Sequence, residues 1–379
     1  MLIVDSLTLY EFCDQIRDAP YIAVDTEFMR EKSYDPYLCL IQVAYGEHSA
    51  AIDPLANGMD LTPLTDLLRD RGITKVLHAA AQDLEIFLNL LGEVPGPIFD
   101  TQIAAAVCDM GEQPGYARVV EALLGIQIDK SSQLTDWSLR PLSQRQVTYA
   151  IGDVTHLCEV YEKLVEQLES SGRTSWIEQD MKELQDPSKY RVLPEVAYKR
   201  IKIRRPKRRT LAVLRELAAW RESTAKSRNI PRKWVVADDA LSEIAQNLPQ
   251  NTKQLGRVRK LKANNADGDA LLAAVRRGLA VSDDDMPPLP AKKATVYADD
   301  SLVALLQALL RLRCEANGVA MKMVANRADL EKLAGLKKPD VRALHGWRRE
   351  VFGNDALALL QGKLALTGRK GRVATLGEE

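Results

Sequence analysis

Several patterns that would point to a particular class of protein are missing from this sequence of 379 residues. The five cysteines form no C-x-x-C pair and are odd in number, so we predict buried thiols rather than a zinc knuckle or a disulfide framework. The four histidines include no H-E-x-x-H motif, so a histidine-ligated zinc enzyme is not expected and any metal should bind to oxygen. The lack of a G-x-x-x-x-G-K-[ST] phosphate loop argues against an ATP-driven helicase and against a nucleotide cofactor.

Long apolar runs are also missing. No segment approaches the roughly 18 to 20 residues that cross a bilayer, and the N-terminus lacks a basic region before its first acidic residues. We therefore expect no membrane association and a cytoplasmic location. Aromatic residues make up only 6%, but the 46% hydrophobic and 27% charged residues are typical of a folded protein, and the length predicts two or three domains.

The formal net charge of zero hides opposite charges in the two parts of the chain. Residues 1–186 contain 13 Lys and Arg against 31 Asp and Glu, whereas residues 187–379 contain 39 against 21. A basic part joined to an acidic part indicates a polyanionic partner, although a solvated surface without a partner has the same composition. We assign substrate capture to the basic region that begins at Lys199.

Changes in composition predict the domain boundaries. Residues 1–186 should form an α/β domain, and residues 187–209, with a K-R-I-K-I-R-R-P-K-R-R run from 199, should form a basic linker. Residues 210–281 have the pattern of short helices. Residues 282–294 contain S-D-D-D-M-P-P-L-P and predict an acidic, proline-rich linker, followed by a second helical domain over 295–370.

Within the first domain, strand and helix patterns alternate. Segments 21–26, 38–45 and 49–52 predict strands, and their short spacings favour antiparallel neighbours. Residues 61–69 predict a helix, 76–78 another short strand, and 83–91 a helix that ends at Gly92. Ser143 and Gln146 have the spacing of a capping box and predict the start of a long helix that runs to about Ser170.

Two acidic residues stand at the end of the first of these strands. Asp25 and Glu27 lie two residues apart, so their side chains should share one face, with Thr26 on the other. An exposed strand end would also explain such a pair. However, the apolar segment 21–24 leads directly into it, and two carboxylates buried side by side are costly without a cation.

Three more residues are candidates for the same site. Asp83 follows the strand over 76–78 near a helix start, where the helix dipole alone would favour an acid, and His78 is more simply a core histidine than a ligand. Tyr149 and Asp153 are one turn apart on the long helix, so both can reach one site. Asp100 and Asp53 are competing carboxylates, but a helix cap and a turn explain them more simply.

Together these residues resemble the motifs of the DEDD exonucleases in their tyrosine-bearing branch, and within it the ribonuclease D family. The resemblance covers roughly the first 170 residues. It depends on V-D-T-E-F at 24–28, L-C-L-I-Q at 38–42, H-A-A-A-Q-D-L-E at 78–85, and T-D-W-S-L-R-P-L-S at 135–143 continuing into Y-A-I-G-D-V at 149–154. The region 210–281 is similar to the HRDC modules that accompany this nuclease, and 295–370 resembles a degenerate second copy.

The resemblance implies an α/β RNase H-like (DnaQ-like) exonuclease domain with a mixed sheet, followed by one or two small all-α HRDC-like domains. It implies a 3′-to-5′ exoribonuclease that releases 5′-monophosphates. Two divalent ions, Mg²⁺ or Mn²⁺, would be held by Asp25, Glu27, Asp83 and Asp153, and Tyr149 would orient the attacking water. The expected partner is RNA with a free 3′ end, in particular tRNA precursors, and the expected state is a monomer. The alternatives are a DNA-directed exonuclease and a catalytically silent RNA-binding scaffold.

Overall fold

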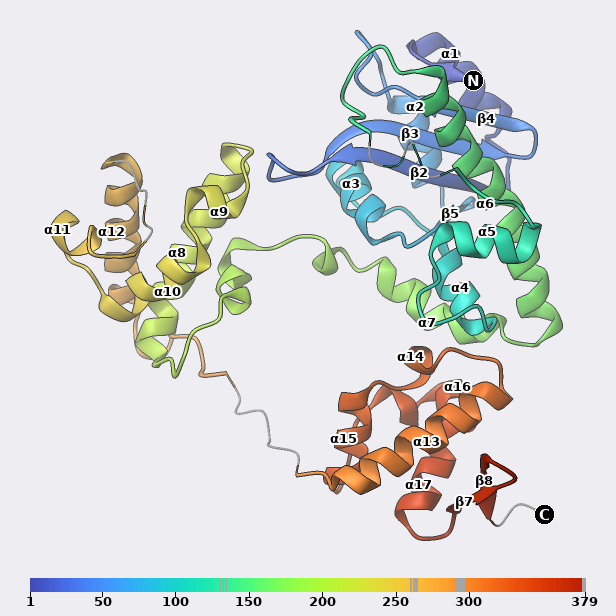
Figure 1. The fold of residues 1–379 in the computed structure, drawn as a ribbon. Helices are drawn as coiled ribbons and strands as arrows, with labels where there is room; N and C mark the ends of the chain where they lie inside the picture. The colour runs from blue at the N-terminus through green and yellow to red at the C-terminus, as the bar shows by residue number, and fades with distance from the viewer. Residues whose placement is uncertain are drawn as a thin grey trace.

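The computed structural model describes residues 1–376 apart from 130, 132, 134, 260, 262–264 and 291–296. Three modules are visible in Figure 1: a mixed α/β nuclease module, a first helical module around α8, and a second helical module around α13. This arrangement confirms the predicted fold class. Within the described ranges, no helix has the length and apolar character needed to span a membrane.

The nuclease module is built on a six-stranded sheet with the order β1-β4-β3-β2-β5-β6. Strands β2, β3 and β4 are antiparallel neighbours, as the sequence predicts, whereas β1 pairs parallel to β4, and β2, β5 and β6 are parallel to one another. The strands are β1 (Leu2–Ile3), β2 (Tyr21–Met29), β3 (Tyr37–Tyr45), β4 (His48–Ile52), β5 (Thr74–Leu77) and β6 (Ile98–Asp100).

Helices cover both faces of this sheet. Side chains at alternate positions of β2 therefore pack in two separate hydrophobic cores, one on each face. Ile22 and Val24 pack in a core with α1, α2 and α3, whereas Tyr21 and Ala23 pack against α6. The helices of the module are α1 (Ser6–Gln15), α2 (Thr62–Arg69), α3 (Ala81–Leu91), α4 (Thr101–Val107), α5 (Tyr116–Leu124), α6 (Gln144–Ser170) and α7 (Thr174–Leu184).

Two helix ends confirm the capping predictions. Ser143 and Gln146 form the predicted capping box at the start of α6. Gly92, with φ 82°, ends α3 in the left-handed conformation that glycine adopts without steric cost. These ends matter because α3 and α6 carry three of the predicted site residues.

The first helical module has its own hydrophobic core. The short 3-10 helix η3 (Pro194–Arg200), inside the segment expected to be a basic linker, adds Ala197 to that core and packs on α8. Two arginines of the basic run, Arg208 and Arg209, bind backbone carbonyls near the end of α12. The helices are α8 (Arg208–Ser227), α9 (Arg232–Val235), α10 (Asp238–Asn247), α11 (Thr252–Leu255) and α12 (Asn265–Ala280), preceded by η2 (Pro187–Lys189).

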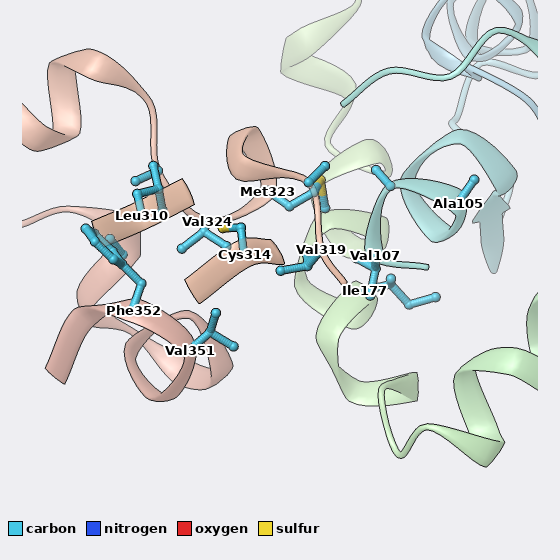
Figure 2. Close-up of a cluster of buried hydrophobic side chains, with 14 of the residues drawn as sticks. Ala105, Val107, Ile177, Leu310, Cys314, Val319, Met323, Val324, Val351 and Phe352 are labelled. Atoms are coloured by element: carbon cyan, nitrogen blue, oxygen red, sulfur yellow. The ribbon is translucent and has the colours of Figure 1, made fainter. Parts of the chain in front are cut away.

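The second helical module shares one continuous hydrophobic core with the nuclease module. Figure 2 shows Val319 and Met323 of the helical module beside Val107 and Ile177 of the nuclease module. Residues of the nuclease module therefore pack in the same core as residues of the second helical module. The module contains α13 (Asp300–Ala316), α14 (Met321–Val324), α15 (Arg327–Gly335), η4 (Arg342–Leu344), α16 (Gly346–Arg348), the π-helix η5 (Arg349–Gly353), α17 (Asn354–Leu360), and a hairpin, β7 (Ala365–Arg369) with β8 (Arg372–Leu376), that the sequence did not predict.

The first helical module contacts the nuclease module through the hairpin that joins β2 and β3. The Tyr34 hydroxyl donates a hydrogen bond to Glu222 on α8, and the Tyr34 backbone N–H donates to Asn229. The guanidinium of Arg232 lies over the Tyr34 ring, 4.4 Å from its centroid. Figure 1 shows this hairpin extending from the sheet toward α9, so the loop that makes the intermodule contact directly follows the strand that carries Asp25 and Glu27.

Candidate active site

Three of the predicted carboxylates converge where β2 passes beneath α6. Oxygen atoms of Asp25, Glu27 and Asp153 lie within 4.8 Å of one another. The first two come from β2, as the two-residue period predicts, and the third comes from α6. An all-oxygen set at this separation matches the ligands that Mg²⁺ and Mn²⁺ prefer.

Asp83 approaches the same strand from α3 but lies outside the three-residue cluster. Its carboxylate accepts a hydrogen bond of 2.5 Å from the hydroxyl of Thr26, the residue that separates Asp25 and Glu27 along β2. Both partners are buried. Thr26, predicted on the opposite face from its neighbours, therefore anchors the carboxylate of the fourth acidic residue.

The electrostatics of the cluster favour a bound cation. Burial raises the pKa of Asp25 well above its ordinary value, and repulsion from Asp83, Asp153 and Glu27 raises it further. Burial also raises the pKa of Glu27 to about 8 and that of Asp153 to about 7. Because like charges this close oppose one another's ionisation, a divalent ion would stabilise the ionised carboxylates. The donor set therefore fits the predicted metal site.

Tyr149 lies at the edge of this cluster, on the same helix as Asp153. Its hydroxyl interacts with the Asp153 carboxylate, and this interaction lowers the pKa of Asp153 against the larger effect of burial. Burial and the nearby Asp153 raise the pKa of Tyr149 above its ordinary value, so the phenol is neutral at physiological pH and can donate a hydrogen bond. The structure thus brings Asp25, Glu27 and Asp153 together with Tyr149 nearby, whereas Asp83 lies beside the cluster and bonds Thr26.

Tyr116, which sequence reasoning missed, supports the carboxylates from α5. Its hydroxyl donates to the backbone carbonyl of Asp153 inside α6. The His78 ring lies 5.3 Å from the Tyr116 ring and bonds Thr101 and the Pro114 carbonyl, as expected of a core histidine. No spacing rule connects positions 116 and 153, so only the packed structure reveals this contact.

A buried amide lies directly across the sheet from the cluster. Gln42 on β3 pairs with Asp25 in the antiparallel register, which places both side chains on one face. Gln42 is fully buried, and neither atom of its amide has a hydrogen-bond partner among the described residues. The indole N–H of Trp137, whose ring lies 6.2 Å from that of Tyr149, is also buried without a partner there. Unpaired buried polar groups are rare and tend to mark functional sites.

The competing carboxylates have structural roles. Asp100 caps α4 by accepting from the Gln102 backbone N–H, and Asp53 forms a two-pronged ion pair with Arg140. Arg140 also donates to the Cys39 carbonyl, so this pair fixes the loop before α6 to β3 and β4. The five cysteines are free thiols, and only Cys108 is not fully buried.

Comparison with known proteins agrees with this geometry. Residues 2–169 match the family model described as a 3′-5′ exonuclease, and residues 210–275 match the HRDC domain model. The chain is 46% identical to a ribonuclease D from Sphingobium indicum over 377 residues, which cover 98% of this chain and 97% of the relative. It is 43% identical to a ribonuclease D from Zymomonas mobilis, with 98% and 97% covered.

The chain belongs to the ribonuclease D family. The crystal structure of Escherichia coli RNase D superposes on it with a TM-score of 0.80 at 34% identity, covering 96% of this chain and 98% of that chain. As a ribonuclease D family member, the enzyme is a 3′-to-5′ exoribonuclease. Divalent metal dependence follows from the exonuclease family, and the carboxylate cluster is consistent with it.

Proposed function

We propose that this ribonuclease D family enzyme removes nucleotides one at a time from the 3′ ends of structured RNA, in particular tRNA precursors, with two Mg²⁺ or Mn²⁺ ions. The observation that carries the proposal is the convergence of Asp25, Glu27 and Asp153. Asp25 would hold the ions because repulsion from Glu27, Asp83 and Asp153 raises its pKa, and a cation would relieve that repulsion. Glu27, Asp83 and Asp153 complete the ligand sets.

The proposed reaction is hydrolysis of the last phosphodiester bond. A water oxygen bonds to phosphorus, the bond from phosphorus to the 3′ oxygen breaks, and that oxygen gains a proton. The terminal nucleotide leaves as a 5′-monophosphate. When bound, the ions supply activation of the water and stabilisation of charge on the leaving oxygen.

Tyr149 is assigned to orient the attacking water through its hydroxyl. Its raised pKa makes it a poor base near neutral pH, so positioning is favoured over proton abstraction. The phenol interacts with the Asp153 carboxylate, and the Tyr116 hydroxyl donates a hydrogen bond to the Asp153 backbone carbonyl. Together these contacts hold the Tyr149 hydroxyl beside the carboxylate cluster.

The preference for structured RNA is supported by a relative. The Escherichia coli protein is described as an exoribonuclease involved in structured RNA processing, and it aligns with nearly the whole of this chain. The basic region after residue 186 supplies positive charge that the acidic nuclease module lacks. We infer that the enzyme acts as a cytoplasmic monomer.

The test compares Asp25→Asn with Asp66→Asn, which removes one exposed carboxylate from α2. The substrate is a 5′-labelled RNA with a free 3′ hydroxyl, in Mg²⁺, beside a DNA oligonucleotide of the same sequence. Wild type and Asp66→Asn should shorten the RNA from its 3′ end and release nucleoside 5′-monophosphates. Asp25→Asn should remain folded and lose turnover by about 10³-fold or more, as when a group that stabilises the transition state is removed. A folded Asp25→Asn protein with near wild-type turnover would overturn the proposal, and faster cleavage of the DNA would overturn the RNA assignment.

A further inference from the structure

A cavity of about 540 Å³ lies between the β2–β3 hairpin and the first helical module. Arg30 and Tyr34 line it from the hairpin, and Arg200, Arg232 and Lys233 line it from the helical module. Five basic and two acidic side chains contribute to its wall. The nuclease module is strongly acidic overall, so this local excess of positive charge is unusual in its position.

Three of the five basic side chains form ion pairs, and two of these pairs lie within the helical module. Arg232 forms a two-pronged ion pair with Glu222 at 2.6 and 2.7 Å, and Glu222 is buried. Arg221, also buried, binds Asp238 at 2.6 Å. The first pair joins α9 to α8 beside Tyr34 of the hairpin, and the second joins α8 to α10, so these charges are used in contacts within the protein.

The other basic groups remain open to solvent. Arg200 and Lys233 are exposed, and their side chains form no ion pair or hydrogen bond with any residue that the structure describes. Arg30 is paired with Glu85 at 2.7 Å, but 42% of its side chain is exposed. The cavity therefore presents these two exposed cations and one half-exposed arginine to an anionic ligand.

The cavity lies close to the carboxylate cluster along a single strand. Arg30 follows Glu27 by three residues, which corresponds to about 10 Å of extended chain. A polynucleotide whose 3′ end lies at the carboxylates can reach the cavity by following the hairpin, with its first few phosphates behind the scissile one. A single phosphate or small anion would need only one of these cations, whereas a spread of cations suits a repeating polyanion.

An exposed aromatic side chain lies next to Lys233. Trp234 on α9 has 61% of its surface exposed, so its ring is accessible to a ligand. Proteins that bind single strands combine basic grooves with aromatic rings on which bases stack. Lys233 and Trp234 offer both contacts on consecutive residues.

We propose that the cavity between the β2–β3 hairpin and α9 binds the single-stranded segment of RNA just upstream of its 3′ end, with Arg30, Arg200 and Lys233 contacting phosphates and Trp234 stacking on a base. This inference rests on the proposed action on RNA and adds where the strand is held. Because the site includes both modules, the first helical module aligns the strand with the carboxylates. The β2–β3 hairpin fixes the distance between the two sites.

The test uses the full chain with the double substitution Arg200→Ala/Lys233→Ala. The matched control is Lys253→Ala/Arg257→Ala, which removes two exposed basic groups of the same module outside the cavity, on and just after α11. In Figure 1, α11 lies on the side of the module away from the nuclease. KM and turnover are measured from about 50 to 200 mM salt, on an RNA of some twelve nucleotides and on a trinucleotide.

The double substitution in the cavity should raise KM for the long RNA about tenfold and leave turnover at saturation unchanged. It should also reduce the slope of log KM against log salt by about 0.7 for each phosphate that the variant no longer neutralises. The trinucleotide is too short to fill the cavity, so its KM should not change. Trp234→Ala should raise KM for the long RNA without changing the salt slope, and Trp234→Phe should restore much of the affinity.

Equal KM values and salt slopes for the cavity variant and the control variant would overturn the proposal, as would an equal rise in KM on the trinucleotide. A loss of turnover at saturating RNA would show that these residues shape the active site instead of holding the strand. Failure of the wild-type enzyme to cleave any RNA would refute the proposed function itself. The wild-type measurement therefore distinguishes failure of the proposed RNA site from failure of the proposed function.

Discussion

The indole rings of Trp176 and Trp347 stack face to face, with 4.2 Å between their centroids and 3° between their planes. The first belongs to α7 of the nuclease module and the second to α16 of the second helical module. The Trp347 N–H also donates to the Trp176 carbonyl at 2.9 Å. Nearby, Asp180 accepts from both Arg342 and Arg348. The stacked pair is thus part of a boundary with both apolar and charged contacts.

We expect Trp347→Ala to lower the free energy of unfolding by about 2–4 kcal/mol. Truncating a large buried aromatic costs about 3–5 kcal/mol, and Trp347 is only partly buried. Thermal and urea denaturation would measure the change. Trp234→Ala, at an exposed tryptophan in the other helical module, should change stability by no more than about 0.5 kcal/mol. Equal stability of the two variants would contradict the shared core.

Tyr149→Phe should reduce turnover by about 10²-fold and leave KM for RNA largely unchanged, because the hydroxyl acts on the attacking water and not on RNA binding. Single-turnover kinetics at saturating RNA would measure the effect. Tyr161→Phe, further along α6 and packed against Tyr21, is the control and should retain turnover. Wild-type turnover in Tyr149→Phe would refute the positioning role.

Binding of Mg²⁺ should release protons near neutral pH. Burial raises the pKa of Glu27 to about 8 and that of Asp153 to about 7, so below these values the carboxyls hold protons that the ion must displace. Affinity for Mg²⁺ should therefore fall as the pH is lowered from about 8 to 6. Calorimetric titration in buffers with different ionisation enthalpies would count the protons, and Asp153→Asn should release fewer. Affinity that is constant over this pH range would contradict the prediction.

Gln42→Leu should separate stability from metal binding. An unpaired buried amide costs about 1–3 kcal/mol, so an apolar residue of similar size should leave stability equal or higher. Gln42 faces the same side of the sheet as Asp25, and loss of a polar neighbour of a metal ligand typically weakens metal affinity by about 10–100-fold. Titration of activity with Mg²⁺ would measure this, with the exposed Gln167→Leu as control. If Gln42→Leu needs the same Mg²⁺ concentration for activity as the wild type, the Gln42 amide does not contribute to metal binding.

Much of the nuclease module could be predicted because its signals are local. The period of two along β2 placed Asp25 and Glu27 together, and the capping box at Ser143 fixed the start of α6 and hence the face that Tyr149 and Asp153 share. These patterns involve residues that are neighbours along one strand or one helix. Periodicity alone was enough to place them.

The contacts that the sequence did not reveal join distant segments. Tyr116 reaches the Asp153 carbonyl, Arg140 pairs with Asp53, and Tyr34 contacts Glu222 across 188 positions. The charge difference between the two parts of the chain indicated separate functions, but it could not show that α13 and α4 share apolar packing. Such pairings depend on how the modules meet in three dimensions, which no short pattern encodes.

The core shared by the nuclease and second helical modules also affects how the enzyme is made. Residues 104–107 of α4 are synthesised well before Val319, which lies beside Val107 in the shared core (Figure 2). A growing chain therefore carries exposed apolar surface next to a nearly complete set of metal ligands. The nuclease module therefore gains its full hydrophobic cover only after the second helical module has been synthesised.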